Sequence, residues 1–326
     1  MPQNKSSMAA ELPLPVASSS RDRTLAYAAW ITVCIVWGTT YLAIRVALES
    51  IPVALLAGLR WTAAGVLLTA ALPFARQSLP HPRAWGPIVL VGFLMMVVGN
   101  GGVVWAEQYV ASGLTAVVVA IIPFWTVVVE TLLPRGERLT TRTLTGLAIG
   151  FMGILVLVWP ELTLGNREGR VFIAGIAALQ LACIGWALGT AFTKRNVMAT
   201  TPLAASALQM LLSGVMLMVI GTATGEWNRL AFTTRTAGAM LYLIIFGSVV
   251  GYSAYVYALK RLPVSTVSQY AYVNPIIAVV LGTLLLAEPL SIRTFLAAVL
   301  VFAGIAVVKS APHAQAAPAA ACHTEV

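Results

Sequence analysis

Long apolar blocks separated by short polar segments run through most of the chain. A helix needs roughly 20 apolar residues to cross the hydrocarbon core of a bilayer, and ten blocks of about this length follow one another in the sequence. Most of the connecting segments are shorter than about ten residues, which leaves no room for a second soluble domain. The pattern therefore predicts an all-α integral membrane protein with ten transmembrane helices, at residues 25–44, 53–75, 85–105, 113–133, 142–159, 171–193, 202–221, 237–259, 266–286 and 291–309.

The composition agrees with a membrane protein and argues against several other classes. Hydrophobic residues make up 59% of the chain and charged residues 10%, whereas a soluble domain carries about 25% charged residues. The net charge of +9 comes from Lys and Arg that stand singly or in pairs, so no basic face for nucleic acid forms. No Walker motif for a nucleotide is present, and the three cysteines form neither a disulfide framework nor a CxxC metal site. We expect no metal and no cofactor.

The basic residues predict the orientation of the chain in the membrane. With the N-terminus in the cytoplasm, 13 Lys and Arg residues fall on the cytoplasmic side and six on the other, and Arg60 lies within the second span. Cytoplasmic loops carry an excess of basic residues, so we expect a multi-pass protein of the cell inner (plasma) membrane with both termini inside. Residues 1–24 and 310–326 are predicted to be disordered cytoplasmic ends, and the first apolar block is interpreted as a retained helix.

The sequence repeats itself weakly with an offset near 150 residues. Cys34 and Trp37 in the first span correspond to Cys183 and Trp186 in the sixth, and further pairs follow in the same order: Pro52 and Pro202, Pro123 and Pro275, Glu137 and Glu288, Gly153 and Gly304. Keeping the order and spacing of so many pairs through a whole half is hard to obtain by chance. We therefore expect a first repeat at 25–159, a linker at 160–170 and a second repeat at 171–309.

The number of helices in each repeat determines how the repeats are related. Five helices per repeat make the second repeat enter the membrane from the opposite side, so the two are inverted. Inverted repeats recur in transporters, with the substrate site at their interface near mid-membrane. One pattern in two orientations can form two conformations of similar energy, each open to a different side.

Several short motifs resemble one family. They are Trp37-Gly-Thr-Thr-Tyr41 followed by Arg60, Pro with Gly-Glu-Arg-Leu-Thr at 123–140, Pro with Ala-Glu-Pro-Leu-Ser at 275–291, and Tyr270-Ala-Tyr-Val-Asn-Pro275. Together they resemble the EamA family of the drug/metabolite transporter superfamily, in particular bacterial inner-membrane metabolite and amino-acid exporters. The resemblance covers roughly residues 25–309 and implies ten helices, a central cavity and export of metabolites such as amino acids.

The second repeat departs from the first at two of these positions. Trp186 is followed by Ala-Leu-Gly where Trp37 is followed by Gly-Thr-Thr, and Gln209 stands near the position that corresponds to Arg60. The second repeat is therefore not expected to duplicate all contacts of the first.

Two prolines stand inside predicted spans. Pro123 and Pro275 each remove a backbone donor and free a carbonyl one turn earlier, at Val119 and Ala271. The kink can serve packing, or it can open a polar cavity at mid-membrane. Their equivalent positions in the two repeats favour a cavity.

Polar and aromatic side chains mark candidate positions on that cavity. Polar groups inside a membrane face the bundle interior or a cavity, although helix–helix hydrogen bonds and aromatic belts at the membrane surface are alternative roles. A cavity with aromatic walls and hydroxyl or amide groups suits a zwitterion with an apolar or aromatic side chain. The predicted cavity residues are Trp37, Thr40, Asn100, Trp186, Tyr252, Tyr255, Tyr270 and Asn274; Gln269 and Tyr272 lie on a neighbouring face of the ninth span.

Charged residues within the spans need a partner or water. Arg60 is interpreted as a carboxylate anchor or a gate, with snorkelling to the surface as the alternative. Glu130 could carry a coupling proton, but its position shortly before Arg135 favours the cytoplasmic surface. Glu137 and Glu288 precede the fifth and tenth spans and are predicted to cap those helices. GxxxG patterns at 146–150, 185–189 and 247–251 predict close helix contacts.

Taken together, these features predict a secondary transporter that exports small metabolites by alternating access, with amino acids, aromatic ones included, as the leading substrates. A multidrug carrier of the same superfamily is the alternative. A channel would favour a charged ring or a filter sequence, and a membrane-embedded enzyme would favour an acid pair or a Ser/His set within the spans. The sequence shows neither pattern, so we expect neither a channel nor an enzyme. The expected partners are a small-molecule substrate and the lipid bilayer, without nucleic acid or nucleotide, and a monomer is one oligomeric state to consider.

Overall fold

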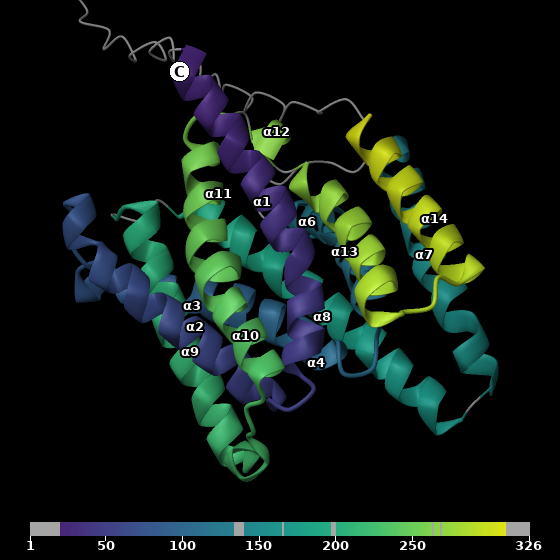
Figure 1. The fold of residues 1–326 in the computed structure, drawn as a ribbon. Coiled ribbons are helices and arrows are strands. Elements are labelled where there is room, and N and C mark those ends of the chain that lie inside the picture. The colour runs from purple at the N-terminus through teal and green to yellow at the C-terminus, as the bar shows by residue number, and fades with distance from the viewer. Residues whose placement is uncertain are drawn as a thin grey trace, which may run out of the picture.

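The structure is a computed structural model that describes residues 20–133, 140–164, 166–196, 200–262, 264–267 and 269–310. Of the predicted disordered ends, only residues 20–24 and 310 lie within these ranges. Glu137 lies outside them. The described chain is helical throughout its regular elements (Figure 1). Its first repeat holds α1 (Ser20–Ala47), α2 (Val53–Ala71), α3 (Trp85–Gly92), η3 (Phe93–Asn100), α4 (Gly101–Ala106), α5 (Ser112–Val119), α6 (Ile122–Leu132) and α7 (Thr141–Leu164).

The second repeat has the same sequence of elements. Its helices are α8 (Arg167–Arg195), α9 (Pro202–Ala223), α10 (Thr234–Tyr242), η5 (Leu243–Val250), α11 (Gly251–Leu259), α12 (Val264–Val267), α13 (Tyr270–Leu286) and α14 (Ile292–Lys309). Short 3₁₀ turns are η1 (Pro73–Ala75), η2 (Pro82–Ala84) and η4 (Glu226–Arg229).

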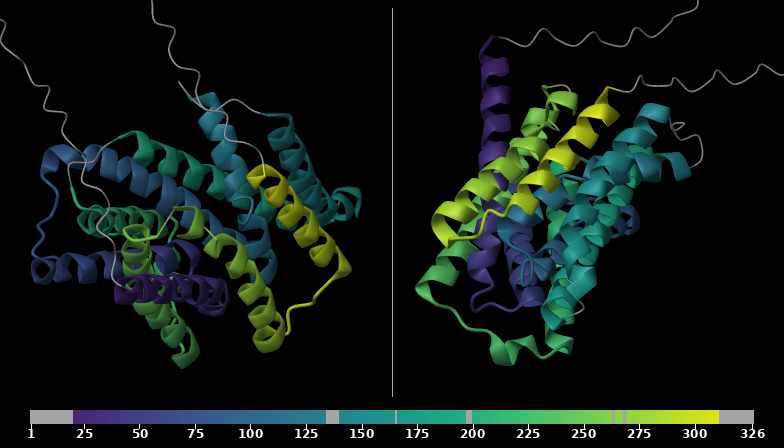
Figure 2. Two further views of the ribbon diagram at one scale, coloured as in Figure 1. Left: turned by 90° about the horizontal axis from the view of Figure 1, so that it is seen from above. Right: turned by 90° about the vertical axis from the view of Figure 1, so that its right-hand side faces the viewer.

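The ten predicted spans correspond to ten helical segments. Within the described residues, nine are long and apolar enough to cross a membrane, and the tenth, α13, is apolar with 17 residues. That length is at the lower end of what spans a bilayer. The Ser20 end of α1 and the Lys309 end of α14 lie at the same end of the bundle (Figures 1 and 2), as an even number of crossings requires.

The outer surface of the bundle is apolar. Large side chains such as Leu181, Val219, Leu284 and Phe295 are more than half exposed, which in water would create extended apolar patches. In a bilayer the same surfaces are solvated by lipid. The exposed apolar belt and the helical segments together make this a multi-pass membrane protein.

The expected linker between the repeats differs in the structure. The predicted linker at 160–170 is largely helical, because α7 continues to Leu164 through Pro160 and α8 begins at Arg167. The side chain of Asn166 accepts a hydrogen bond from the backbone nitrogen of Gly169 (2.7 Å) and so caps the N-terminus of α8. The helix of the third span runs through Gly99-Asn100-Gly101-Gly102 and ends at Ala106, within one residue of the expected bound at 105.

The third helix of each repeat contains a π-helical segment. Phe93–Asn100 and Leu243–Val250 are wound as π-helices, and each is followed by an α-helix that begins with glycine, Gly101 or Gly251. The two segments begin 150 residues apart, the offset seen in the sequence. π-Turns are rare and frequently mark functional sites. Their matched positions support the repeat independently of sequence similarity.

The two repeats interlock instead of packing as separate bodies. The first helix of each repeat packs against the third and fourth helices of the other: α1 contacts α10, α11 and α13, and α8 contacts η3, α4 and α6. Corresponding helices also pair directly, α2 with α9 and α7 with α14 (Figure 2). The exchange is reciprocal, as two inverted copies around a central axis require.

Glycines allow the closest of these approaches. A Cβ atom on Gly214 would lie 2.3 Å from the backbone nitrogen of Thr62, and one on Gly304 would lie 2.5 Å from the carbonyl oxygen of Gly146. The helix contacts predicted for the GxxxG patterns are therefore present: 146–150 meets α14, 185–189 meets η3, and 247–251 meets α1.

Candidate functional site

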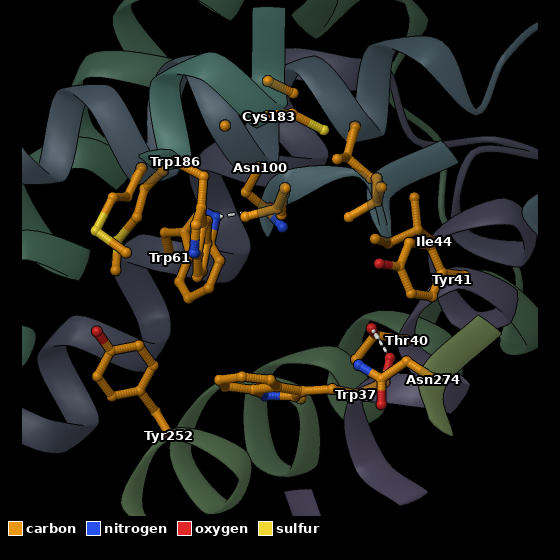
Figure 3. A pocket seen from close by; sticks show the side chains of 18 of the residues that line it. Trp37, Thr40, Tyr41, Ile44, Trp61, Asn100, Cys183, Trp186, Tyr252 and Asn274 are labelled. Atoms are coloured by element: carbon orange, nitrogen blue, oxygen red, sulfur yellow. Dashed lines mark hydrogen bonds between the residues drawn. The ribbon is translucent and has the colours of Figure 1, made fainter. Parts of the chain in front are cut away.

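A cavity lies at the centre of the bundle, where the two repeats meet (Figure 3). Its volume is about 130 Å³, close to the roughly 150 Å³ of an apolar cavity that binds benzene. The cavity therefore has room for one ring-sized group as it stands. Both repeats line it, through Trp37, Thr40, Tyr41, Ile44, Arg60, Trp61, Met95, Met96, Gly99, Asn100, Val103, Val119, Ile122, Ala182, Cys183, Trp186, Gly247, Tyr252, Tyr270 and Asn274.

Trp37 of α1 forms one wall and is held in place by the second repeat. Its ring nitrogen donates a hydrogen bond to the carbonyl oxygen of Gly247 (3.2 Å). The ring meets Tyr270 edge-on at 4.9 Å and Tyr255 at 5.2 Å between centroids. A Cβ atom on Gly251 would lie 2.6 Å from the ring nitrogen, so the glycine provides the space that the ring occupies.

The opposite wall carries Trp61, Trp186 and Asn100 (Figure 3). The ring nitrogen of Trp61 donates to the Asn100 side-chain oxygen (3.0 Å), which ties α2 to the π-helix η3. Ring faces therefore stand on both sides of the cavity, with amide groups between them. The pairing also explains how Asn100 is tolerated inside the membrane.

Arg60 is buried beside the cavity and does not reach the surface. Its side chain is 3% exposed, its Nε donates to the hydroxyl of Ser248 (3.0 Å), and its guanidinium lies 4.5 Å from the ring centre of Trp61. Ser248 in turn donates to the carbonyl oxygen of Leu243 (3.0 Å), five residues earlier in the π-helix. Nη1 of Arg60 is buried without a hydrogen-bond partner among the described residues. A cation thus remains available at the cavity wall.

Asn274 both lines the cavity and joins two helices. With its amide nitrogen toward the backbone, it donates to the carbonyl oxygens of Tyr270 and Cys34, both at 3.0 Å. Thr40, another lining residue, donates to the carbonyl oxygen of Trp37 one turn earlier (2.7 Å). The two roles considered for Asn274, cavity wall and helix–helix bond, therefore occur together.

The two prolines act differently from each other. Pro275 lies inside α13, next to Asn274 on the cavity wall, as expected of a kink. Pro123 is not in the interior of a helix: α5 ends at Val119, and Pro123 is the second residue of a new helix, α6, which begins at Ile122. Proline is well suited to the first turn of a helix because no intrahelical bond is lost there. The break opens onto the cavity, since Val119 and Ile122 both line it.

Some residues expected near the cavity lie elsewhere. Tyr255 stands behind Trp37 and not among the lining residues. Tyr272 packs against Phe302, with the Lys309 ammonium 4.3 Å from its ring centre, and Gln269 is exposed. Conversely, Trp61, Met95, Met96 and Ser248 belong to the site or its support but carry no motif in the sequence, and Tyr41 lines the cavity although only its place in a family motif marked it.

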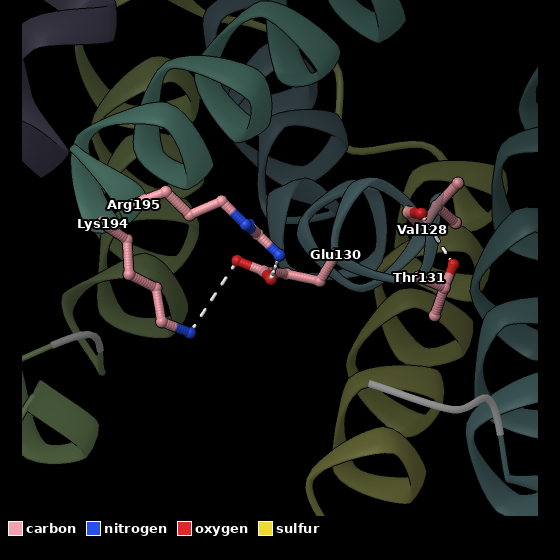
Figure 4. A network of polar contacts seen from close by, with 5 residues as sticks. All are labelled: Val128, Glu130, Thr131, Lys194 and Arg195. Atoms are coloured by element: carbon pink, nitrogen blue, oxygen red, sulfur yellow. Dashed lines mark hydrogen bonds and ion pairs between the residues drawn. The ribbon is translucent and has the colours of Figure 1, made fainter. Parts of the chain in front are cut away.

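An ion pair joins the two repeats at the end of the bundle where α14 ends. The Glu130 carboxylate of α6 lies 2.8 Å from the guanidinium of Arg195 and 3.8 Å from the ammonium of Lys194, both at the end of α8 (Figure 4). Glu130 is therefore close to the surface, with 13% of its side chain exposed. Its pairing accounts for its charge without a coupling proton.

Glu288 joins the two repeats at the other end of the bundle. Its carboxylate accepts hydrogen bonds from the backbone nitrogens of Ser112 (2.8 Å) and Gly113 (3.1 Å) and so caps α5. The expectation that Glu288 caps the helix following it is wrong, because Ser291 caps α14 by accepting from Thr294 (3.1 Å). The cap crosses from the second repeat to the first, and a loop position alone does not reveal that.

Comparison with known proteins agrees with this architecture. The sequence profile of the EamA-like transporter family matches residues 24–159 and 173–310, one match for each repeat. The chain belongs to this family. A protein of Escherichia coli K12, described as the uncharacterized inner membrane transporter YedA, is 37% identical over 285 residues, or 86% of this chain and 90% of YedA. Our protein is thus a transporter of the inner membrane with a small-molecule substrate.

Two more distant matches cover most of the length of this EamA-family transporter. A probable amino-acid metabolite efflux pump of Escherichia coli K12 is 27% identical over 301 residues, covering 88% of this chain and 94% of the pump. A solved crystal structure with 20% sequence identity aligns with a TM-score of 0.59 over 87% of this chain and 96% of its own. The last comparison shows the fold alone.

Proposed function

We propose that this EamA-family transporter exports small zwitterionic metabolites with an aromatic or apolar side chain, amino acids foremost, by alternating access. The observation that carries the proposal is the cavity itself, whose lining combines aromatic rings with two amides and a guanidinium that keeps one nitrogen without a hydrogen-bond partner among the described residues. The relative described as a probable amino-acid metabolite efflux pump supports the same class of substrate.

Each part of such a substrate finds a matching group. A carboxylate suits the free Nη1 of Arg60, since guanidinium–carboxylate bonds are strong and directional. An ammonium group suits the faces of Trp37 and Tyr270 through cation–π attraction. A ring-sized side chain suits the space of about 130 Å³ between Trp37 and Trp186. The cavity must widen to admit a whole aromatic amino acid.

The ends of the bundle supply two candidate gates. Arg45 in the last turn of α1 and Lys194, next to Arg195 at the end of α8, stand 149 residues apart, as Trp37 and Trp186 do, so the basic ends of the two helices occupy equivalent positions in the two repeats. Since α1 and α8 cross in opposite directions, the two arginines lie at opposite membrane surfaces. Arg195 pairs with Glu130, and Arg45 donates to the carbonyl oxygen of Glu107. Opening one contact while keeping the other would expose the cavity to one side only.

The excess of basic residues at the end carrying Lys194, Arg195 and Lys309 supports a cytoplasmic location for that end. Both termini would then be inside the cell, and export would run from the Arg195 gate to the Arg45 gate. The transported molecule leaves unchanged, so no catalytic role is assigned to any residue.

Counterflow in proteoliposomes tests the proposal, with labelled phenylalanine as the probe. We expect saturable counterflow that Asn274→Ala and Tyr270→Ala reduce at least several-fold, while Tyr272→Ala, on the same helix but away from the cavity, transports normally. Wild-type rates in both cavity variants would refute the site. Flux that does not saturate would indicate a channel, and a chemically altered product would indicate an enzyme. Thermal stabilisation by hydrophobic drugs but not by amino acids would indicate the multidrug carrier.

A further inference from the structure

Glu107 is a buried carboxylate that the transport cavity does not use. The residue directly follows α4, and its side chain is 0% exposed. Neither of its carboxylate oxygens has a hydrogen-bond partner among the described residues, and none of the ion pairs found there within 4 Å involves it. A buried ionised carboxylate without partners is very costly, so such a group stays neutral by holding a proton.

Glu107 stands between the cavity and the outside. Val103, one turn before it, lines the central cavity. Gln108, directly after it, lines a second hollow of about 670 Å³ at the Arg45 end of the bundle. That outer vestibule is bounded by Arg45, Leu48, Glu49, Gln108, Ala111, Leu286, Ala287, Glu288 and Pro289. Glu107 therefore lies between a residue that lines the central cavity and one that lines the outer vestibule.

We propose that Glu107 is the proton-binding residue of this transporter, which takes up a proton from the outer vestibule as the outer passage closes and releases it when the cavity opens to the cytoplasm. The proposal rests on the proposed transport function and adds the coupling ion to it. Entry of substrate from the cytoplasm and entry of a proton from outside would then alternate, so that an inward proton gradient drives export.

The charged groups around Glu107 come from every side. Arg45 on α1 binds the backbone carbonyl of Glu107, Arg60 approaches from α2, and Glu288 from the loop after α13. Burial is the largest effect and raises the pKa of Glu107 well above its usual 4.5. Glu288 raises this pKa further, whereas Arg45 and Arg60 lower it. The neutral form is therefore favoured in the closed arrangement.

Opening the cavity to the cytoplasm reverses this balance. Water would reach Glu107 through the cavity, its O–H bond would break with transfer of the proton to that water, and the remaining carboxylate could pair with the guanidinium of Arg60, which lines the cavity. Sodium is less suited to the position than a proton, because Arg45 and Arg60 already place positive charge there.

Infrared titration of the purified protein tests protonation without any substrate. We expect the carbonyl stretch of a protonated carboxyl group to persist well above the pH at which exposed carboxylates ionise, to vanish in Glu107→Gln and to remain in Glu168→Gln. Glu168 is the matched control because it is an exposed glutamate in the first turn of α8. An unchanged band in Glu107→Gln would overturn the proposal even if transport proceeds as proposed.

Transport driven by a pH gradient tests the coupling. In proteoliposomes we expect accumulation of phenylalanine against its gradient to fall at least tenfold in Glu107→Gln, while counterflow, which needs no net proton movement, is retained. Pyranine trapped inside should report proton movement with the wild type and with Glu168→Gln only. Retained proton-driven accumulation in Glu107→Gln, or accumulation driven by a sodium gradient in the wild type, would refute the proposal.

Absence of phenylalanine transport in every protein would refute the proposed substrate, whereas the infrared band would still support or overturn proton binding at Glu107.

Discussion

The ring nitrogen of Trp37 and the carbonyl oxygen of Gly247 are joined by a hydrogen bond of 3.2 Å that links the first helix of one repeat to the π-helix of the other. The bond helps to position the Trp37 ring, which forms one wall of the cavity. Its donor and acceptor are 210 residues apart in the chain. The geometry of the cavity wall therefore depends on how the two repeats fit together, and substitutions at their contact should alter substrate binding.

Gly251→Ala is expected to move this wall. The new methyl group would lie 2.6 Å from the Trp37 ring nitrogen and must displace the ring and its hydrogen bond. We expect apparent affinity for phenylalanine to weaken about tenfold, which is about 1.4 kcal/mol, in ligand-induced stabilisation assays. Gly238→Ala on the preceding helix is the control, because nothing lies within 4 Å of its added methyl group. Equal affinities in the two variants would contradict this role of Gly251.

Neutralising Glu130 should loosen the gate at the Arg195 end. Glu130→Gln removes the 2.8 Å ion pair with Arg195, a partly exposed pair for which we expect about 0.2–1 kcal/mol. The shift in conformation would be read as faster maleimide labelling from the cytoplasmic side of Cys183, which lines the cavity, with the other cysteines replaced. Lys194→Gln serves as the comparison, since Lys194 is 69% exposed and lies 3.8 Å from Glu130. Slower or unchanged labelling in Glu130→Gln would count against a gate.

Loss of the Glu288 carboxylate should destabilise the protein. In Glu288→Ala the backbone nitrogens of Ser112 and Gly113 lose their acceptor, and leaving such donors unmet costs about 1–3 kcal/mol. We expect a clear drop in apparent melting temperature in detergent. Ser291→Ala, which removes the exposed cap of α14, should have a smaller effect. A larger drop in Ser291→Ala would show that the cap between repeats matters less than this geometry indicates.

Glu107 should make stability depend on pH. Burial raises the pKa of this carboxyl in the folded protein above 4.5, so the folded state binds more protons than the unfolded state between those two pKa values. The contribution is complete below 4.5 and is lost as the pH rises through the folded-state pKa. Apparent melting temperature should therefore fall with rising pH across that window, and Glu107→Gln should flatten the fall. An identical pH profile in both proteins would contradict a raised pKa.

Much of the fold could be predicted from local patterns. A bilayer demands apolar helices of nearly fixed length, so the block from Pro202 onward predicts its helix, α9, to within two residues at each end. Repetition of Trp37 and Trp186 then indicated the cavity, because equivalent residues of inverted repeats meet at the centre. Asn274 could be found because an amide in an apolar helix needs a partner.

The remainder could not be predicted locally. Trp61 has no sequence signal that separates it from lipid-facing tryptophans, and only packing against η3 turns it toward Asn100. The π-helices at Phe93–Asn100 and Leu243–Val250 leave no known local mark, since they arise where neighbouring helices accept an irregular turn. Glu107 stands just beyond a span in the sequence, and burial by other helices alone makes it unusual.

The amino-acid sequence by itself determined the number of helices, their inverted repetition and the residue types available at the centre, because these follow from hydrophobicity and periodicity along the chain. The tertiary structure alone decided which side chains meet. Trp37 reaches Gly247, Glu288 caps α5, and Glu107 loses its contact with water only when helices from both repeats come together. Hydrogen bonding and desolvation depend on these distant neighbours, so the chemistry of the site belongs to the folded molecule.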